Sequence, residues 1–265
     1  MDYIRLLAAF AIVWFHSNAP GHQLAYLGLP FFLVLLGLPS RASLKVKARR
    51  LLRPFVVWSL IYSGAKMVQA LLRHEPPLGW LEPWMLMTGT SLHLWFLPFA
   101  FVVSLLYLRD HPKWLLGLMP VVGALAMIVF AKVLSPPFAQ WAFGIVPLTL
   151  GYCYFRCGRW VVLPWVISVA LLFAFRPASD NGAIALGTAA SLLLMQIRLP
   201  QSALSDWCAR LSLLIYLDHL LVIGVGQFIG LTSYALALFA ISGAMVLSLG
   251  ITWLARVTRF GALLT

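Results

Sequence analysis

Long apolar runs with almost no charge follow one another along this chain, and they limit its possible folds more than any other feature. The run from Leu6 to Phe15 has no polar side chain, and similar runs recur between Pro, Gly and basic clusters. Only 10% of the 265 residues are charged and 62% are hydrophobic, whereas a soluble domain needs about a quarter of its residues charged. The runs are continuous, and a membrane β-barrel would alternate polar and apolar residues. The sequence therefore predicts an all-α, polytopic membrane helical bundle.

The length of the apolar runs predicts about ten transmembrane helices, because one helical crossing takes roughly 20 residues. The predicted spans are 3–18, 24–40, 54–72, 93–109, 114–134, 140–155, 160–175, 183–197, 209–228 and 234–255. The first run could instead be a secretory signal, but it lacks a small-x-small cleavage site, so we expect it to be retained. No internal repeat or linker is visible, and residues 1–265 are expected to form a single transmembrane domain.

The distribution of Lys and Arg predicts the orientation of the bundle. With the N-terminus inside, the outer segments hold only Lys66, Arg73, Lys132 and Arg176. The inner segments hold Arg5, Arg41, Lys45, Lys47, Arg49, Arg50, Arg53, Arg109, Lys113, Arg156, Arg159, Arg198, Arg210, Arg256 and Arg259. Cytoplasmic loops carry the excess of Lys and Arg, so both termini are expected in the cytoplasm, in a bacterial-type inner membrane. The net charge of +12 is spread over short loops, which favours membrane lipids over nucleic acid as partners.

Arg5 and His16 are the first polar residues that need an explanation. Eleven helical residues rotate by about 1100°, three turns plus about 20°, and rise about 16 Å, so both side chains lie on one stripe. His16 then lies near the middle of the membrane, where ionisable residues usually line a pathway, and histidine exchanges a proton near neutral pH. Asp2, one turn before Arg5, is expected to orient the guanidinium. The alternatives are a snorkelling anchor for Arg5 and an interhelical hydrogen bond for His16.

The segment KVKARRLLRP, residues 45–54, is the densest basic cluster of the chain. If it is helical, Arg49, Arg50 and Arg53 crowd one side, and arginine forks suit phosphate oxygens. A cytoplasmic ligand with several phosphates, such as coenzyme A, would suit this cluster. The alternative is a topology signal that contacts lipid head groups.

The segment HLWFLP, residues 93–98, is expected at the outer mouth of the fourth span. Trp95 could be an aromatic residue of the membrane interface, but His93 is not typical of that belt. The two side chains are candidates for binding an acceptor with flat apolar faces and hydroxyls, as sugars have.

The segment SLLIYLDH, residues 212–219, carries Ser212, Tyr216 and His219 at spacings of four and three, which makes one polar stripe. His219 also lies near the middle of its span, and the alternative for the stripe is a structural hydrogen-bond clamp. Asp218 points to another side of the helix. Its partner is open at this point, with Lys66 and Lys132 as candidates.

The cysteines do not indicate a metal site or a disulfide framework. Cys153 and Cys157 lie at the end of a span without a neighbouring His or carboxylate, and we interpret them as small buried hydrophobic residues. No metal cofactor is expected.

Several of these motifs resemble the integral-membrane acyltransferase-3 family of bacterial O-acyltransferases, over nearly the whole chain. DYIRLLAAFAIVWFH resembles the first-span pattern of that family, with Asp2, Arg5 and His16 in its Asp, Arg and His places. GLPFFLVLLGL resembles the second-span motif, except that Leu36 stands where Ser is usual before Gly37.

The later motifs of the chain follow in the family's order. RRLLRP resembles the basic motif after the second span, matched by Arg50, Arg53 and Pro54, while HLWFLP and SLLIYLDH match fourth-span and late-span patterns. The resemblance implies a ten-helix bundle that takes an acyl group, usually acetyl, from cytosolic acyl-CoA and passes it to a hydroxyl of an extracytoplasmic glycan or lipid-linked sugar. No extracytoplasmic transferase domain is present in the chain, so the transfer is expected to be completed within the membrane part.

The expected function is therefore a membrane O-acyltransferase. The resemblance implies His16 as general base, with Arg5 and Asp2 in its surroundings, and the Arg pair as a contact of the CoA phosphates; a covalent acyl-His16 intermediate is the open alternative. Arg49, Arg50 and Arg53 are expected to bind acyl-CoA. The expected acceptor-binding residues are His93, Trp95, Tyr216 and His219. The rival classes are a transporter or flippase for an anionic or sugar-linked substrate, and a non-catalytic membrane scaffold, which would leave both histidines unexplained.

Overall fold

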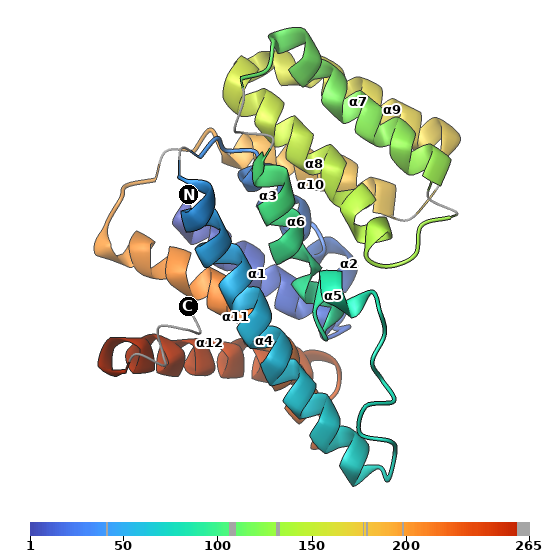
Figure 1. The fold of residues 1–265 in the computed structure, drawn as a ribbon. Helices are drawn as coiled ribbons and strands as arrows, with labels where there is room; N and C mark the ends of the chain where they lie inside the picture. Colours follow the sequence, from blue (N-terminus) through green and yellow to red (C-terminus); the bar gives the residue numbers. More distant parts are fainter. Residues whose placement is uncertain are drawn as a thin grey trace. The chain divides into compact units, whose positions relative to one another are not determined.

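The chain folds into helices throughout the part that the structure describes (Figure 1). In this computed structural model the described residues are 1–40, 42–105, 110–130, 133–176, 178, 180–197 and 199–258. No strand occurs among these residues, which confirms the all-α prediction. Five cations of the orientation argument lie outside the described residues: Arg41, Arg109, Lys132, Arg198 and Arg259.

A helix overlaps every predicted span. The elements are α1 (Asp2–His16), α2 (His22–Ala25), α3 (Gly28–Leu36), α4 (Leu44–Leu72), α5 (Met85–Thr88), η1 (Leu92–Trp95), α6 (Phe96–Val103), α7 (Lys113–Phe130), α8 (Phe138–Cys157), η3 (Gly158–Val161), α9 (Val162–Phe175), α10 (Asp180–Leu194), α11 (Ala203–Phe228) and α12 (Ser233–Val257).

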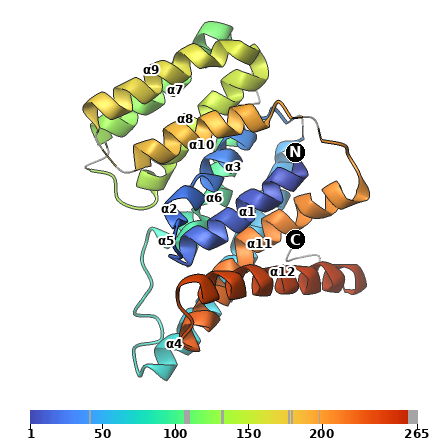
Figure 2. The ribbon, with the colours of Figure 1, turned by 180° about the vertical axis from the view of Figure 1, so that it is seen from behind.

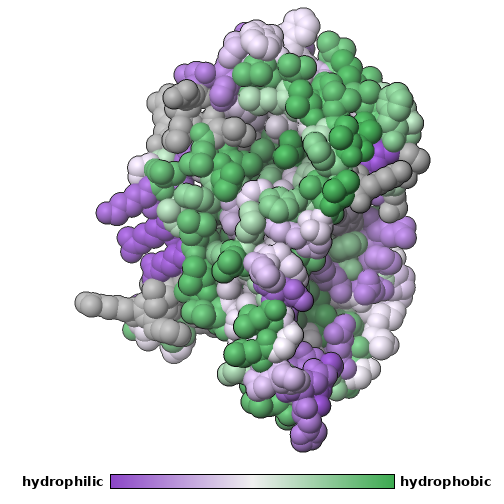
Figure 3. Space-filling model, turned by 45° about the vertical axis from the view of Figure 1, so that its right-hand side comes forward, coloured by the Kyte–Doolittle hydropathy of each residue, from purple (hydrophilic) through white to green (hydrophobic). Residues whose placement is uncertain are grey.

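Five of the described helical segments are long and apolar enough to cross a membrane. They are Leu44–Leu72, Lys113–Phe130, Phe138–Phe175, Ala203–Phe228 and Ser233–Val257. Two shorter apolar segments, His22–Leu36 and Leu92–Val103, fall below that length. Hydrophobic side chains cover most of the face shown in Figure 3, with hydrophilic ones gathered toward its edges. The chain is thus a multi-pass membrane protein, while ten crossings and cytoplasmic termini stay predictions.

The chain divides into two compact units. Unit 1 comprises Met1–Pro39, Arg109–Leu134 and Ala142–Ser248, and unit 2 comprises Ser40–Leu108, Ser135–Trp141 and Leu249–Thr265. Within unit 1, α1 packs along α11, α3 packs against α10, and α7 packs against α9, as Figures 1 and 2 both show. Within unit 2, α4 packs against α6.

Two glycines let α3 and α8 of unit 1 cross in direct backbone contact. A Cβ on Gly37 would overlap the backbone of Gly151 and Tyr152, and a Cβ on Gly151 would overlap the carbonyl group of Val34. Small residues let helices in a membrane approach closely. The Gly37 of the second-span motif is therefore required by packing at this crossing.

Helix α4 begins ten residues before the predicted span, which started at Pro54. Ser43 caps the helix, with its Oγ accepting from the Val46 backbone N–H at 3.4 Å, and Pro54 lies buried inside the helix. Helices of membrane bundles tolerate an interior proline, because neighbouring groups satisfy the freed backbone. The basic segment is therefore helical, as the arginine-face argument requires.

Candidate active site

The structure brings two of the predicted site histidines together between α1 and α11. The imidazole rings of His16 and His219 lie 5.2 Å apart, centroid to centroid, and are tilted by 36°. His16 is the last residue of α1 and is half-buried, while His219 is fully buried inside α11. The buried face of α1 includes Ala8 and Ala9, whose small side chains permit close approach of a neighbouring helix.

The ring of His219 is oriented by its own helix. Its Nδ1 lies 2.8 Å from the carbonyl oxygen of Tyr216 and 3.1 Å from that of Ile215. A carbonyl oxygen only accepts, so Nδ1 carries the proton, and in the neutral ring Nε2 is then the basic nitrogen. The Tyr216 ring lies 6.2 Å from the His219 ring. This turn of α11 therefore holds an imidazole in one tautomer next to His16.

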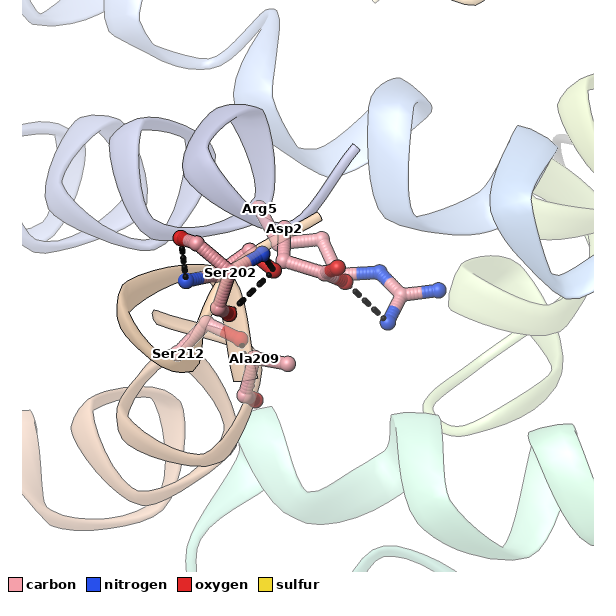
Figure 4. Close-up of polar contacts among 6 residues, drawn as sticks. Asp2, Arg5, Ser202, Ala209 and Ser212 are labelled. Carbon is pink, nitrogen blue, oxygen red and sulfur yellow. Dashed lines mark hydrogen bonds and ion pairs between the residues drawn. The ribbon is translucent and has the colours of Figure 1, made fainter. Parts of the chain in front are cut away.

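The predicted pair of Asp2 and Arg5 is present at the other end of α1. Arg5 Nη1 donates to Asp2 Oδ1 at 2.9 Å, and both side chains are partly buried. Figure 4 shows this pair together with the hydrogen bonds of Ser202, the residue that caps the neighbouring α11. Because α1 is one continuous helix, Arg5 and His16 lie on the stripe that their spacing predicts.

The predicted polar stripe of α11 is buried in unit 1. Ser212, Tyr216 and His219 have exposed fractions of 3%, 6% and 0%. The Ser212 hydroxyl donates to the Ala209 carbonyl at 2.9 Å, within its own helix. Because the Ser212 hydroxyl donates to its own helix, Tyr216 and His219 are the remaining side chains of the stripe that could act on a substrate.

The partner of Asp218 differs from the lysines suggested by the sequence. Asp218 Oδ2 accepts from the hydroxyl of Ser248 at 2.8 Å, whereas the Lys66 ammonium lies over the Trp80 ring at 5.3 Å and Lys132 lies outside the described residues. The partners suggested by the sequence were both cations, but a neutral hydroxyl also satisfies a buried carboxyl oxygen. Ser248 carried no signal in the sequence, because serine is common in helices that pack in membranes.

The predicted donor-binding arginines belong to unit 2. Arg49 and Arg50 are exposed and Arg53 is half-buried. Lys47 of the same segment is buried instead, with its Nζ donating to the Ser104 carbonyl at 3.2 Å, beside the end of α6. The sequence pattern did not distinguish Lys47 from the arginines of this segment. Lys47 binds a backbone carbonyl within the unit, whereas Arg49 and Arg50, less than one turn later, are exposed and can contact a ligand.

His93 and Trp95 are buried in unit 2, each with 5% of its surface exposed. His93 Nδ1 lies 2.9 Å from the Ser91 hydroxyl, and its ring meets the Tyr62 ring edge-on at 5.2 Å. Trp95 packs against Phe99 with ring centroids 5.4 Å apart. This burial disfavours the alternative in which Trp95 is an interfacial belt residue.

The three cysteines are free thiols. Among the described residues, no group of three His, Cys, Asp or Glu side chains lies close enough together to hold a metal ion.

The part of the chain that the structure describes is all-helical, and these helices define a multi-pass membrane protein with a histidine pair between two packed helices. A family model described as an acyltransferase domain matches residues 1–257, and the match runs through both compact units. The chain therefore belongs to the acyltransferase-3 family and is a membrane acyltransferase. No curated protein and no solved structure matches it significantly.

Proposed function

We propose that the chain is an O-acyltransferase that moves an acyl group, most simply acetyl, from cytosolic acyl-CoA to a hydroxyl of an extracytoplasmic or lipid-linked glycan. The observation that carries this proposal is the His16–His219 pair, 5.2 Å apart in a chain of the acyltransferase-3 family. Transfer to a hydroxyl requires a base, and histidine is the most common general base in proteins.

His16 has the role of general base in this proposal. It takes the proton of the acceptor hydroxyl while the oxygen attacks the thioester carbonyl. The carbon–sulfur bond breaks, and the CoA thiolate recovers the proton from the His16 imidazolium. In the covalent alternative, a His16 nitrogen attacks the thioester first, and the carbon–sulfur bond breaks while the CoA thiolate takes the ring proton. The acceptor hydroxyl then attacks the acyl-imidazole, and His16 leaves with the hydroxyl proton. His219, with its ring held by the Tyr216 carbonyl, supports His16 in both routes.

The donor is assigned to the basic face of α4. Arg49 and Arg50 are exposed, so their guanidinium groups are free of the burial that holds Lys47, and their fork geometry suits the phosphates of CoA. Arg5, oriented by Asp2 at 2.9 Å, is proposed to help place the donor at the inner end of α1.

Two groups of residues are proposed to serve the acceptor, each within its own unit. They are Tyr216 and His219 in unit 1, and His93 and Trp95 in unit 2. The proposed architecture is a bundle of ten crossings in a bacterial inner membrane with both termini in the cytoplasm, and the distribution of Lys and Arg supports it.

Consumption of the thioester tests the proposed function directly. The purified protein is incubated with acetyl-CoA and a panel of glycan acceptors, free CoA is measured with a thiol reagent, and the acceptors are analysed by mass spectrometry. We expect CoA release that depends on the acceptor, a mass gain of one acetyl group, and loss of both in His16→Gln. Uptake of a sugar-linked substrate into proteoliposomes without release of CoA would contradict the proposal and favour the transporter class.

A further inference from the structure

A buried carboxyl group that the proposed chemistry does not use lies next to His219. Asp218 has 0% of its surface exposed, and its Oδ2 accepts from the Ser248 hydroxyl of α12 at 2.8 Å. Its Oδ1 is also buried, without a hydrogen-bond partner among the described residues. An ionisable side chain within a membrane-spanning helix is costly and usually has a function. Asp218 therefore needs an explanation beyond space filling.

The contact between α11 and α12 follows one face of α11. It pairs Asp218 with Ser248, Val222 with Gly243, and Gly226 with Leu236. Residues 218, 222 and 226 recur every four positions and so share a face. The partner number falls as the α11 number rises, so the two helices run antiparallel. A Cβ on Gly243 would lie 3.8 Å from the Val222 Cβ, and a Cβ on Gly226 would lie 2.6 Å from a Leu236 methyl.

Asp218 and Ser248 form the polar contact of this otherwise apolar series. In a membrane there is little hydrophobic driving force between helices, so apolar contacts alone discriminate weakly between registers that differ by one turn. A slide of four residues moves the helices by about 6 Å. In the direction that replaces Ser248 by Ala244 opposite Asp218, it would leave the carboxyl group facing an apolar side chain, which is costly. A single buried polar residue is known to fix the register of packed helices.

The register of α11 also determines where His219 points. Neighbouring residues differ by about 100° around a helix. The direction of Asp218 toward α12 therefore fixes the direction of the His219 imidazole. Helix α12 also reaches the helix that carries His16, because the Tyr234 and Trp14 rings lie 5.8 Å apart, edge to face. Helix α12 thus contacts both helices of the histidine pair.

We infer that Asp218 and Ser248 are positioning residues, whose hydrogen bond locks the register of α11 against α12 and so places His219 opposite His16. The catalytic consequence of the lock rests on the proposed function, whereas the register itself can be measured without any activity.

A cross-linking pair reports the register. Val222→Cys with Gly243→Cys puts two Cβ atoms about 3.8 Å apart, the usual spacing of a disulfide, in a background where Cys153, Cys157 and Cys208 are replaced by Ala. Val222→Cys with Phe239→Cys reports the slide of one turn that brings Ala244 to Asp218. We expect oxidation to link the first pair at least about tenfold more than the second, as measured by mass spectrometry of the linked peptides.

Breaking the lock should change this pattern. Ser248→Ala, a small change that leaves packing nearly intact, is expected to lower cross-linking of the 222/243 pair and to raise that of the 222/239 pair. Asp218→Ala should do the same, and Asp218→Asn, which keeps an acceptor oxygen, should not. An unchanged pattern in both Ala variants would overturn the inference.

Kinetics supply the second readout. Ser248→Ala and Asp218→Ala are each expected to lower kcat for acyl transfer by about tenfold to a hundredfold, because small misplacements of a catalytic group have that effect. The KM for acetyl-CoA should stay unchanged. The double variant should lose no more of its kcat than either single variant. The kcat of Asp218→Asn should stay within about threefold of wild type, because asparagine keeps an acceptor oxygen.

If the kcat of Asp218→Asn falls as far as that of Asp218→Ala, ionisation rather than register is required, and the inference is wrong. If the cross-links behave as expected while the wild-type protein transfers no acyl group, the lock stands and the proposed function fails.

Discussion

The Nδ1 atom of His219 lies 2.8 Å from the carbonyl oxygen of Tyr216, three residues earlier in α11. Rotation of the ring would break this bond, so His219 presents a fixed imidazole to the neighbouring His16. In the proposed function His16 is the general base and His219 supports it, so we expect the loss of His16 to be the more harmful to transfer.

His16→Gln is expected to lower the rate of acyl transfer by about 10²–10⁴, the usual contribution of a general base. Glutamine still forms hydrogen bonds but does not accept a proton near neutral pH. Acetyl-CoA binding by calorimetry and monodispersity in detergent should remain as in wild type. The matched control is His111→Gln, which lies elsewhere in unit 1 beside Tyr152 and should leave transfer unchanged. Near-normal turnover in a well-folded His16→Gln protein would move the base to His219.

Arg50→Ala combined with Arg53→Ala is expected to weaken acetyl-CoA binding far more than binding of acetyl-pantetheine, which lacks the ribose phosphate and the pyrophosphate. Each lost charge-assisted hydrogen bond is worth about 1.5–3 kcal/mol. Dissociation constants from calorimetry check this, with Lys45→Ala as the control, since Lys45 is an exposed cation of the same segment. Equal losses for both donors would mean that the arginines only set topology.

The loop before α4 is expected on the cytoplasmic side. Ser40→Cys, in the background without native cysteines, should react with a membrane-impermeant maleimide only after the inner face is opened. Ser40 is exposed and precedes the α4 cap, whereas a substitution at Ser43 would remove the side chain that caps the helix. Labelling of intact spheroplasts would reverse the proposed orientation.

Gly37→Ala is expected to destabilise unit 1, because the added methyl group would overlap the backbone of Gly151 and Tyr152. Overpacking of this kind typically costs about 1–3 kcal/mol, measurable as a lowered denaturation temperature in detergent. Gly64→Ala is the matched control. A Cβ on Gly64 meets nothing within 4 Å, and alanine in a helix interior is favoured over glycine by up to about 1 kcal/mol, so this variant should be neutral or slightly more stable. Equal stability of the two variants would refute the backbone contact.

Local patterns of the sequence were sufficient to predict the helices and the short-range polar pairs. The spacing of three between Asp2 and Arg5 predicts their ion pair, since one helical turn fixes both side chains, and the structure confirms it. The predicted span 54–72 lies within α4, which begins ten residues earlier because Ser43 caps the helix before the basic segment.

Contacts between distant helices could not be predicted in the same way. Periodicity places His16 and His219 each on a polar face, but it does not determine which helix that face meets. The contact of Asp218 with Ser248 depends on the register of two helices, which arises from side-chain fit along their whole length. The catalytic roles of these residues stay predictions until the variants above are measured.

The two histidines of the pair come from helices whose positions in the chain are about 200 residues apart. A ribosome adds about 5–20 residues per second, so α1 waits some 10–40 s in the membrane before α11 emerges. During that interval the side of α1 that packs against α11 has to remain uncovered or be shielded by lipid or an insertion factor. The His16–His219 pair therefore cannot form until most of the chain has been synthesised, so a nascent chain lacks this pair throughout most of its biosynthesis.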